Sequence, residues 1–380
     1  MAILRRVTLK GFKSIKETDL ELRPLNILIG ENGAGKSNLV SFFKMLNEMM
    51  AGHLQQYIAT SGRAQSLLHF GPKVTPQLEA RLEFSANPDL SSNHRKHAYS
   101  MRLAHAAGDT LFFAEETLIR EDFLVGNSYG LGSGHLETRI GEAADKGLPT
   151  FQTFQEAAKV LRQLLSGSSV YHFADTSPTA RVRHYSYIND SRRLMTDAGN
   201  LAAFLLRIRG ENETAFQRIL STIHLIAPFF ERFELLPPAT GTGWEAILNW
   251  RDKGSDQIFG PHQLSDGTLR AICLITLLLQ PENELPELIV VDEPELGLHP
   301  YALDIIAGLF KKASHHTQVI ISTQSSSFID HFDPEDVIVV NRKDKESEFS
   351  RLDPTKLEAW LDEYSLGEVW EKNVIGGGPH

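Results

Sequence analysis

The stretch Gly30-Glu31-Asn32-Gly33-Ala34-Gly35-Lys36-Ser37 fits the pattern G-x-x-x-x-G-K-[ST] of a phosphate-binding loop. The apolar run 25–29 before it predicts a buried strand, and the apolar spacing in 39–50 predicts a helix after it. Glycines let backbone N–H groups approach phosphate oxygens, and the helix N-terminus adds a favourable dipole. We expect Lys36 to reach the β- and γ-phosphates and Ser37 to ligate Mg²⁺. The candidate nucleotide-binding residues are Asn32, Gly33, Ala34, Gly35, Lys36, Ser37 and Asn38.

A second candidate site segment is an apolar run that ends in two carboxylates. Residues 288–291 predict a buried strand, and Asp292 and Glu293 follow it directly. Consecutive strand residues point in different directions, so the two carboxylates can serve different roles. Together with the phosphate loop, this pattern predicts that Asp292 helps to hold Mg²⁺ and that Glu293 polarises the attacking water.

A third segment, residues 264–270 (LSDGTLR), precedes a strongly apolar helix predicted over 268–279. Ser265 is a candidate helix N-cap, Asp266 follows it, and Gly267 exposes backbone N–H groups. The segment is a candidate second anion-binding helix start, although an ordinary N-cap would look the same.

The composition limits the function classes. The chain has 380 residues, which predicts two domains or one large domain with an insertion. Its 38 basic and 48 acidic residues give a net charge of −10, which excludes a uniformly basic nucleic-acid coat but leaves room for a local basic groove. The single cysteine, Cys273, excludes an internal disulfide and lies in an apolar run where we expect it to be buried.

The remaining pattern predicts a cytoplasmic α/β protein. No apolar run approaches the roughly 18 residues of a membrane span. Alternating residues in 3–12, 78–84 and 99–103 predict strands, the Gly- and Ser-rich stretch 126–150 predicts a loop, and 151–166 and 197–232 predict helices. From residue 288 onward, strands and helices alternate, which favours a parallel sheet covered on both faces.

The ordered set GENGAGKS, LSDGTLR, VVDEPELGLHP and STQSS resembles an ABC-type ATPase head of the SMC/RecF class, and most of all the stand-alone bacterial AAA/RecF-like ATPases. The opening LKGFKSI, the middle HFADTSP and the terminal WLDEYSLGEVWE extend the resemblance over nearly the whole chain. It implies an α/β, ABC-type P-loop NTPase head with a mixed sheet and no long coiled coil. We expect one lobe from residues 1–84 plus 244–380 and an inserted, mainly helical lid lobe from 85–243.

The resemblance also implies a mechanism. Two protomers would close as an ATP-driven homodimer around two ATP molecules with Mg²⁺. One chain would supply Lys36, Ser37, Asp292 and Glu293, and the other would supply the signature residues Ser265, Asp266 and Gly267. Residues 295–299 match the loop that crosses this interface. Gln324 stands where the class usually has a switch histidine, and its amide can hydrogen-bond but cannot titrate.

The output and the turnover stay open. Slow Mg-dependent ATP hydrolysis could act on DNA, in repair or antiviral defence, or control a partner effector protein. The alternatives are an ATP-dependent scaffold with negligible turnover and a transporter ATPase subunit, which Asp266, Gln324 and the long chain between 37 and 264 disfavour. We expect no membrane partner.

Several polar residues are ambiguous. A basic run interleaved with Tyr185 and Tyr187 could contact nucleic acid or could be an ordinary salt-bridged surface. Its members are Arg181, Arg183, His184, Arg192 and Arg193, and Lys10, Lys13 and Lys16 pose the same question near the N-terminus. The Q-loop falls near Gln65 and 69–71 without a fixing pattern. His299, His315 and His316 lack partners at metal-ligand spacing.

Overall fold

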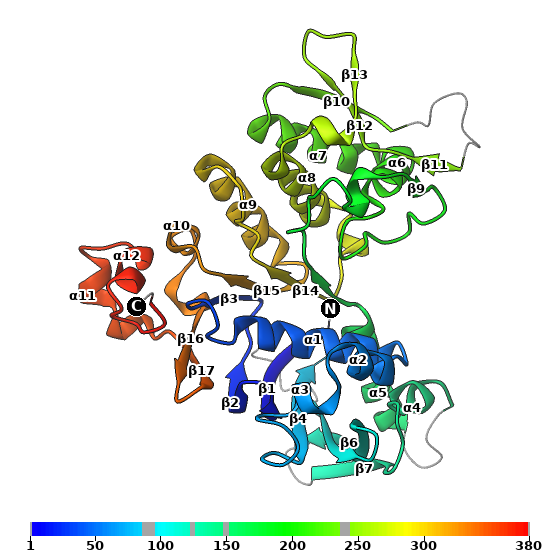
Figure 1. Ribbon diagram of the computed structural model, residues 1–380, viewed down its shortest axis with the longest axis vertical. Helices are drawn as coiled ribbons and strands as arrows, with labels where there is room; N and C mark the ends of the chain where they lie inside the picture. Colours follow the sequence, from blue (N-terminus) through cyan, green and yellow to red (C-terminus); the bar gives the residue numbers. More distant parts are fainter. Residues whose placement is uncertain (1, 86–95, 122–125, 147–151, 236–243, 379–380) are drawn as a thin grey trace.

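A six-stranded, mostly parallel sheet forms the centre of the computed structural model, which describes residues 2–85, 96–121, 126–146, 152–235 and 244–378 (Figure 1). Its strand order is β17-β16-β3-β15-β14-β8. All neighbours are parallel except the edge strand β17, which is antiparallel to β16. The strands are β3 (Leu25–Ile29), β8 (Ser168–Tyr171), β14 (Leu288–Asp292), β15 (Gln318–Thr323), β16 (Val337–Lys343) and β17 (Glu346–Arg351).

The two faces of this sheet belong to two separate hydrophobic clusters. Side chains alternate across a strand, so Ile27 and Ile29 enter one cluster and Leu28 enters the other. Helices α8 (Asp266–Leu279) and α9 (Pro300–Ala313) cover the first face, and α1 (Lys36–Met50) and α5 (Gln152–Ser166) cover the second. Burial on both faces explains why the central strands are continuous apolar runs.

A second, antiparallel sheet packs below α1 and has the order β2-β1-β4-β5-β6-β7 (Figure 1). Its strands are β1 (Ile3–Phe12), β2 (Ile15–Glu21), β4 (Gln77–Ser85), β5 (Lys96–Ala106), β6 (Thr110–Glu121) and β7 (Gly126–Gly132). Three short helices border it: α2 (Leu54–Thr60), α3 (Arg63–Leu67) and α4 (Ile140–Lys146).

The helical lobe occupies the top of Figure 1. It contains α6 (Leu201–Glu211) and α7 (Glu213–Ile226), which pack with α8, and the small strands β9 (Ser186–Tyr187), β10 (Phe230–Glu234), β11 (Glu245–Ala246), β12 (Asn249–Asp252) and β13 (Ile258–Phe259). Asn212 caps α7 by accepting a hydrogen bond from the Ala215 amide at 3.0 Å. The C-terminal part adds α10 (Ser326–Ile329), α11 (Glu358–Leu361) and α12 (Leu366–Glu371).

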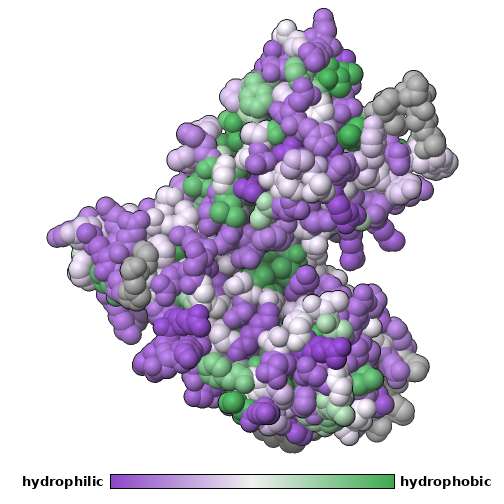
Figure 2. All heavy atoms as spheres, viewed as in Figure 1, coloured by the Kyte–Doolittle hydropathy of each residue, from purple (hydrophilic) through white to green (hydrophobic). Residues whose placement is uncertain are grey.

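The structure confirms the predicted fold class, an α/β head with a mixed sheet and a helical lobe. In the described part of the chain, the longest helices, α1 and α5, have 15 residues each, so there is no long coiled coil there. None of the described helices is long and apolar enough to cross a bilayer. Hydrophilic side chains cover most of the face in Figure 2, with hydrophobic residues in separate groups.

The segment 85–243 differs from the expected helical insertion. Strand β5 pairs with β4, β6 with β5, and β7 with β6, so these three strands extend the antiparallel sheet. Strand β8 pairs with β14 and joins the central sheet. The helices of the upper lobe, α6 and α7, follow β8 in the chain, whereas α4 and α5 precede it and pack with the two main sheets. The second expected boundary adjoins residues 236–243, which lie outside the described residues. Within 126–150, the loop prediction was wrong for β7 and α4, and 147–150 also lie outside the described residues.

Candidate nucleotide-binding site

The phosphate loop follows the buried strand β3 and ends at the first residue of α1. Gly33 and Gly35 have φ values of +79° and +117°, a region that favours glycine. A Cβ on Gly30 would overlap the carbonyl oxygen of Val340 in β16. The predicted motif therefore has the backbone conformation and the close packing that its glycines suggested.

Two serines that are distant in the sequence contact the loop and the start of α1. The Ser347 hydroxyl donates to the Ala34 carbonyl at 2.5 Å and lies 2.6 Å from the Ser14 hydroxyl. The Asn38 side chain donates to Ser14 at 2.5 Å. These contacts tie the loop and the start of α1 to β17 and to the turn between β1 and β2, which fixes the loop's shape.

Gly35→Ala is expected to abolish ATP binding. The new Cβ would overlap the Ser347 hydroxyl, and the φ of +117° would cost about 1–3 kcal/mol for a residue with a side chain. The measurement is nucleotide titration calorimetry. Gly308→Ala on α9 is the control, because a Cβ there meets nothing within 4 Å and should leave binding unchanged. ATP affinity within threefold of wild type in Gly35→Ala would contradict this account of the loop.

Lys36 is buried, with 5% of its surface exposed. Its ammonium donates to the carbonyls of Gly30 at 2.6 Å and Glu31 at 3.0 Å. Burial lowers the pKa of Lys36, and the nearby carboxylates of Glu293 and Asp292 act in the opposite direction. Lys36 therefore lies at the mouth of the loop, within electrostatic reach of the acidic end of β14.

Glu293 directly follows β14 in a left-handed conformation, with φ of +49°. Its amide donates to the Ser322 carbonyl at 2.7 Å, which holds it beside the end of β15. The Gln324 side-chain amide donates to the Glu293 carboxylate. The structure thus brings together Lys36, Asp292, Glu293 and Gln324, which the sequence had placed on three separate segments.

Glu295 is a site residue that sequence reasoning assigned only to the interface loop. Its carboxylate accepts hydrogen bonds from the Thr323 hydroxyl at 2.6 Å and from the backbone N–H of Gln324 at 3.1 Å. Burial raises the pKa of Glu295, and its Oε2 has no hydrogen-bond partner. The contact fixes the backbone that presents Gln324 to Glu293. An acidic residue two positions after Glu293 was the available signal.

The donor set fits Mg²⁺. Ser37 is exposed at the start of α1 and Asp292 is partly exposed at the end of β14, and hydroxyl and carboxylate oxygens are the ligands that this hard cation prefers. The buried Ser322 hydroxyl, beside Asp292 in the strand register, has no hydrogen-bond partner. The Ser37 hydroxyl and the Asp292 carboxylate are the groups of this chain that would hold the ion.

An open cavity of about 530 Å³ adjoins the loop. Three cations, Lys13, Arg342 and Lys345, line it together with Asn38 and the exposed Phe70. Arg342 also donates to the Gly33 carbonyl at 3.1 Å. Cationic and aromatic lining beside a phosphate loop suits the remainder of a nucleotide. Gln65 lines this cavity too.

Residues 264–270 lead into α8, and Ser265 is the N-cap of this helix, as predicted. The Ser265 hydroxyl accepts from the Thr268 amide at 3.2 Å, the contact of an N-cap. A Cβ on Gly267 would overlap the Gly297 carbonyl, so this glycine permits close approach of the loop 294–299. Figure 1 places α8 with the helical lobe and α1 below the central sheet.

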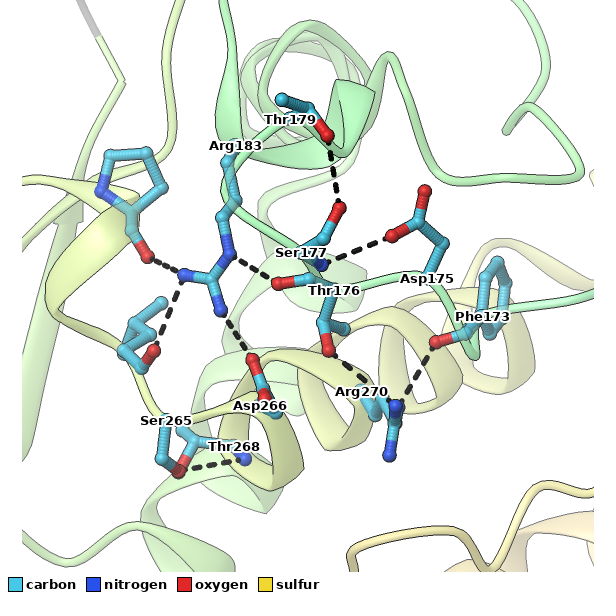
Figure 3. Close-up of polar contacts among 12 residues, drawn as sticks. Phe173, Asp175, Thr176, Ser177, Thr179, Arg183, Ser265, Asp266, Thr268 and Arg270 are labelled. Atoms are coloured by element: carbon cyan, nitrogen blue, oxygen red, sulfur yellow. Dashed lines mark hydrogen bonds and ion pairs between the residues drawn. The ribbon is translucent and has the colours of Figure 1, made fainter.

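Arg270 on α8 contacts the segment that follows β8 (Figure 3) and the loop 294–299. It donates to the carbonyls of Phe173 at 3.2 Å and Ala174 at 2.6 Å, just after β8, and to the Leu296 carbonyl at 2.9 Å. Since β8 neighbours β14, these bonds connect α8 to the sheet edge that carries Asp292.

A family model described as "AAA domain, putative AbiEii toxin, Type IV TA system" matches residues 25–330, from the strand before the phosphate loop to α10. The chain belongs to this family. No curated protein sequence matches this AAA-domain chain significantly.

Solved SMC head structures share its fold. An Smc head bound to the C-winged helix domain of ScpA is 16% identical, with a TM-score of 0.59 over 93% of this chain and 99% of that one. An Smc head with an extended coiled coil, bound to the C-terminal domain of ScpA and derived from Pyrococcus furiosus, is 16% identical, with a TM-score of 0.59 over 96% of this chain and 99% of that one. An Smc head with a coiled coil and joint from Pyrococcus yayanosii is 12% identical, with a TM-score of 0.52 over 96% of this chain and 99% of that one. At this identity the likeness shows the fold.

The basic run of this AAA-domain protein does not form one continuous surface. Arg183 is buried, and Arg181 pairs with Asp197 at 3.0 Å. Arg192 and Arg193 are exposed, as are Tyr185 and Tyr187. Near the N-terminus, Lys10 pairs with Glu17 and Lys16 with Glu346, while Lys13 lines the cavity.

Two other predictions concern cysteine and metals. Cys273 is buried as expected, and burial raises the pKa of its thiol to about 12. Among the described residues of this AAA-domain protein, no group of three or more His, Cys, Asp or Glu side chains is placed to hold a metal ion.

Proposed function

We propose that this protein binds ATP with Mg²⁺ and hydrolyses it slowly. The carrying observation is the position of the buried Lys36, within electrostatic reach of Asp292 and Glu293 and next to the Glu293–Gln324 pair. Phosphate oxygens would replace the two loop carbonyls as acceptors of the Lys36 ammonium. Ser37 and Asp292 would hold Mg²⁺, which supplies charge stabilisation on the phosphates.

Glu293 is the proposed residue that polarises the attacking water, and Gln324 the residue that orients the Glu293 carboxylate. Gln324 donates a hydrogen bond from an amide, which carries no charge and takes up no proton. Glu295 would keep Gln324 in place through its bonds to Thr323 and to the Gln324 backbone. A neutral residue at the position of the switch histidine is the reason to expect low turnover.

We further propose that two protomers close around two ATP molecules. Ser265 is exposed at the N-terminus of α8, and its neighbours belong to the helical lobe and to the loop 294–299. A helix N-terminus attracts anions, so the γ-phosphate on a second protomer is a suitable ligand for it. ATP would then favour the closed state because its phosphate touches both chains only there.

The proposed output is action on DNA or control of a partner effector protein, driven by this opening and closing. The basic residues of 181–193 do not form one continuous surface, so they favour neither DNA nor a partner protein. A scaffold with negligible turnover is the second candidate, favoured by the Gln324 amide. Intact ATP-dependent dimerisation together with the absence of hydrolysis in a single-turnover experiment on the wild-type protein would select the scaffold.

Ser265→Arg is expected to prevent ATP-dependent dimerisation, because the bulky arginine side chain fills the turn where the second protomer's phosphate would bind. ATP binding by each protomer should stay intact, because residue 265 lies outside the phosphate loop. The measurement is the solution mass of Glu293→Gln, with and without Mg-ATP, compared with the Glu293→Gln/Ser265→Arg double variant. Thr214→Arg, in the exposed first turn of α7 in the same lobe, is the control and should dimerise normally.

A mass for Glu293→Gln that is the same with and without Mg-ATP would contradict the dimer model. Repeating the measurement with single-stranded and duplex DNA would separate the outputs, since retained DNA supports the first and its absence supports a protein partner.

A further inference from the structure

Arg183 is a buried arginine beside the signature turn (Figure 3). Its side chain is 6% exposed, and all three of its nitrogens have partners. Nε donates to the Thr176 carbonyl at 2.8 Å, and Nη1 donates to the carbonyls of Pro261 and of Leu264, the latter at 3.3 Å. These bonds tie the turn before α8 to the segment that follows β8.

The remaining nitrogen makes an ion pair inside the signature turn. Nη2 of Arg183 donates to the Asp266 carboxylate at 2.7 Å. Asp266 is the first residue of α8 and its side chain is 64% exposed. The pair therefore joins a fixed, buried cation to an anion at the molecular surface.

Asp266 creates an electrostatic problem for the proposed function. A carboxylate at a helix N-terminus suits the helix dipole, but it repels a phosphate that approaches the same N–H groups. A guanidinium held against that carboxylate offsets its charge and leaves the backbone N–H groups and the Ser265 hydroxyl free to attract an anion.

We infer that Arg183 is the positioning residue of the signature turn: it neutralises Asp266 and holds the turn 261–266 in shape, so that the turn can take an anionic phosphate from a second copy of this chain. The inference rests on the proposed dimer around ATP.

Arg270 has a different task in the same network. Its bonds run to the carbonyls of Phe173, Ala174 and Leu296 and to the Thr176 hydroxyl, which are uncharged groups. Arg183 is the arginine of the pair that contacts a carboxylate of the turn. Arg183 thus compensates the charge of the turn, whereas Arg270 connects α8 to the segment that follows β8.

The test measures ATP-dependent dimerisation in the Glu293→Gln background. Arg183→Met leaves the Asp266 charge without its cation, and the dimer dissociation constant is expected to rise at least tenfold. Asp266→Asn removes the repelling charge and keeps an acceptor for Arg183, so the constant is expected to stay within threefold. The Arg183→Met/Asp266→Asn double variant is expected to recover at least threefold over Arg183→Met.

Recovery in the double variant separates charge neutralisation from simple support. If Arg183 acted only through its bonds to the three carbonyls, removing Asp266 could not restore dimerisation. Arg183→Lys keeps the charge and should lie between wild type and Arg183→Met. The Arg183→Met defect should also shrink in high salt, which screens the exposed Asp266. Arg181→Met, two residues away and paired at the surface with Asp197, is the matched control and should behave like the parent.

The outcomes distinguish this inference from the function beneath it. If the Glu293→Gln parent does not dimerise with Mg-ATP, the proposed function fails. If the parent dimerises and the double variant is no better than Arg183→Met, the role of Arg183 is overturned. Should Arg183→Met fail to fold, Asp266→Asn alone decides, and a tenfold weaker dimer there contradicts the inference.

Discussion

Glu293→Gln is expected to slow ATP hydrolysis by roughly 10²–10⁴-fold, the usual contribution of a general base, while ATP binding survives. A glutamine side chain has nearly the same shape, so the backbone conformation at φ +49° and the hydrogen bond from the backbone N–H of residue 293 to the Ser322 carbonyl should be preserved. It has no charge with which to polarise water. The ATP-bound, closed state should therefore accumulate.

Single-turnover hydrolysis and solution mass with Mg-ATP measure this result. Glu358→Gln makes the same change of charge at an exposed position of α11 and should leave turnover unchanged. Wild-type turnover in Glu293→Gln would contradict the assignment. The matched variant Glu295→Gln would then become the informative one, because Glu295 is the next carboxylate at this edge and contacts the Gln324 backbone.

Lys36→Ala is expected to weaken ATP binding roughly 10–150-fold, which corresponds to about 1.5–3 kcal/mol for a hydrogen bond to a charged group. The ammonium is positioned by the Gly30 and Glu31 carbonyls and faces the carboxylates of Asp292 and Glu293. Without it, these carboxylates would repel the phosphates. ATP-dependent dimerisation should be lost as a consequence.

Nucleotide titration calorimetry measures the affinity, and a thermal melt shows whether the variant is folded. Lys44→Ala, exposed on the same helix two turns further on, removes an equal charge outside the site and should bind ATP normally. A folded Lys36→Ala protein with wild-type affinity would show that the phosphates lie elsewhere. A dimer that forms equally in Lys36→Ala with ATP would show that ATP does not drive association.

Prediction from the sequence succeeded where a feature depends on neighbouring residues. The run before Gly30, the glycine loop and the apolar spacing after Lys36 encode β3, the loop and α1 in one continuous segment. The strand before Asp292 and the Ser265 N-cap were correct for the same reason. Hydrogen bonding and burial within a few residues decide these features.

Prediction was wrong where pairing at a distance decides. The glycine-rich residues 126–132 form a strand because the edge of β6 offers them a partner. Within 85–243, β5 pairs with β4 and β8 pairs with β14, so parts of this segment belong to the two main sheets. A local pattern carries no record of which strand edges are free elsewhere in the chain.

The sequence by itself determined the phosphate loop, the acidic strand end and the N-cap of the signature helix, because each is a contiguous pattern whose backbone geometry follows from its own residue types. Only the tertiary structure decided that Gln324 meets Glu293, that Glu295 fixes Gln324, and that Arg183 lies buried against Asp266 instead of facing nucleic acid. These contacts join residues far apart in the chain, and the packing of the two lobes on the central sheet brings them within hydrogen-bond distance.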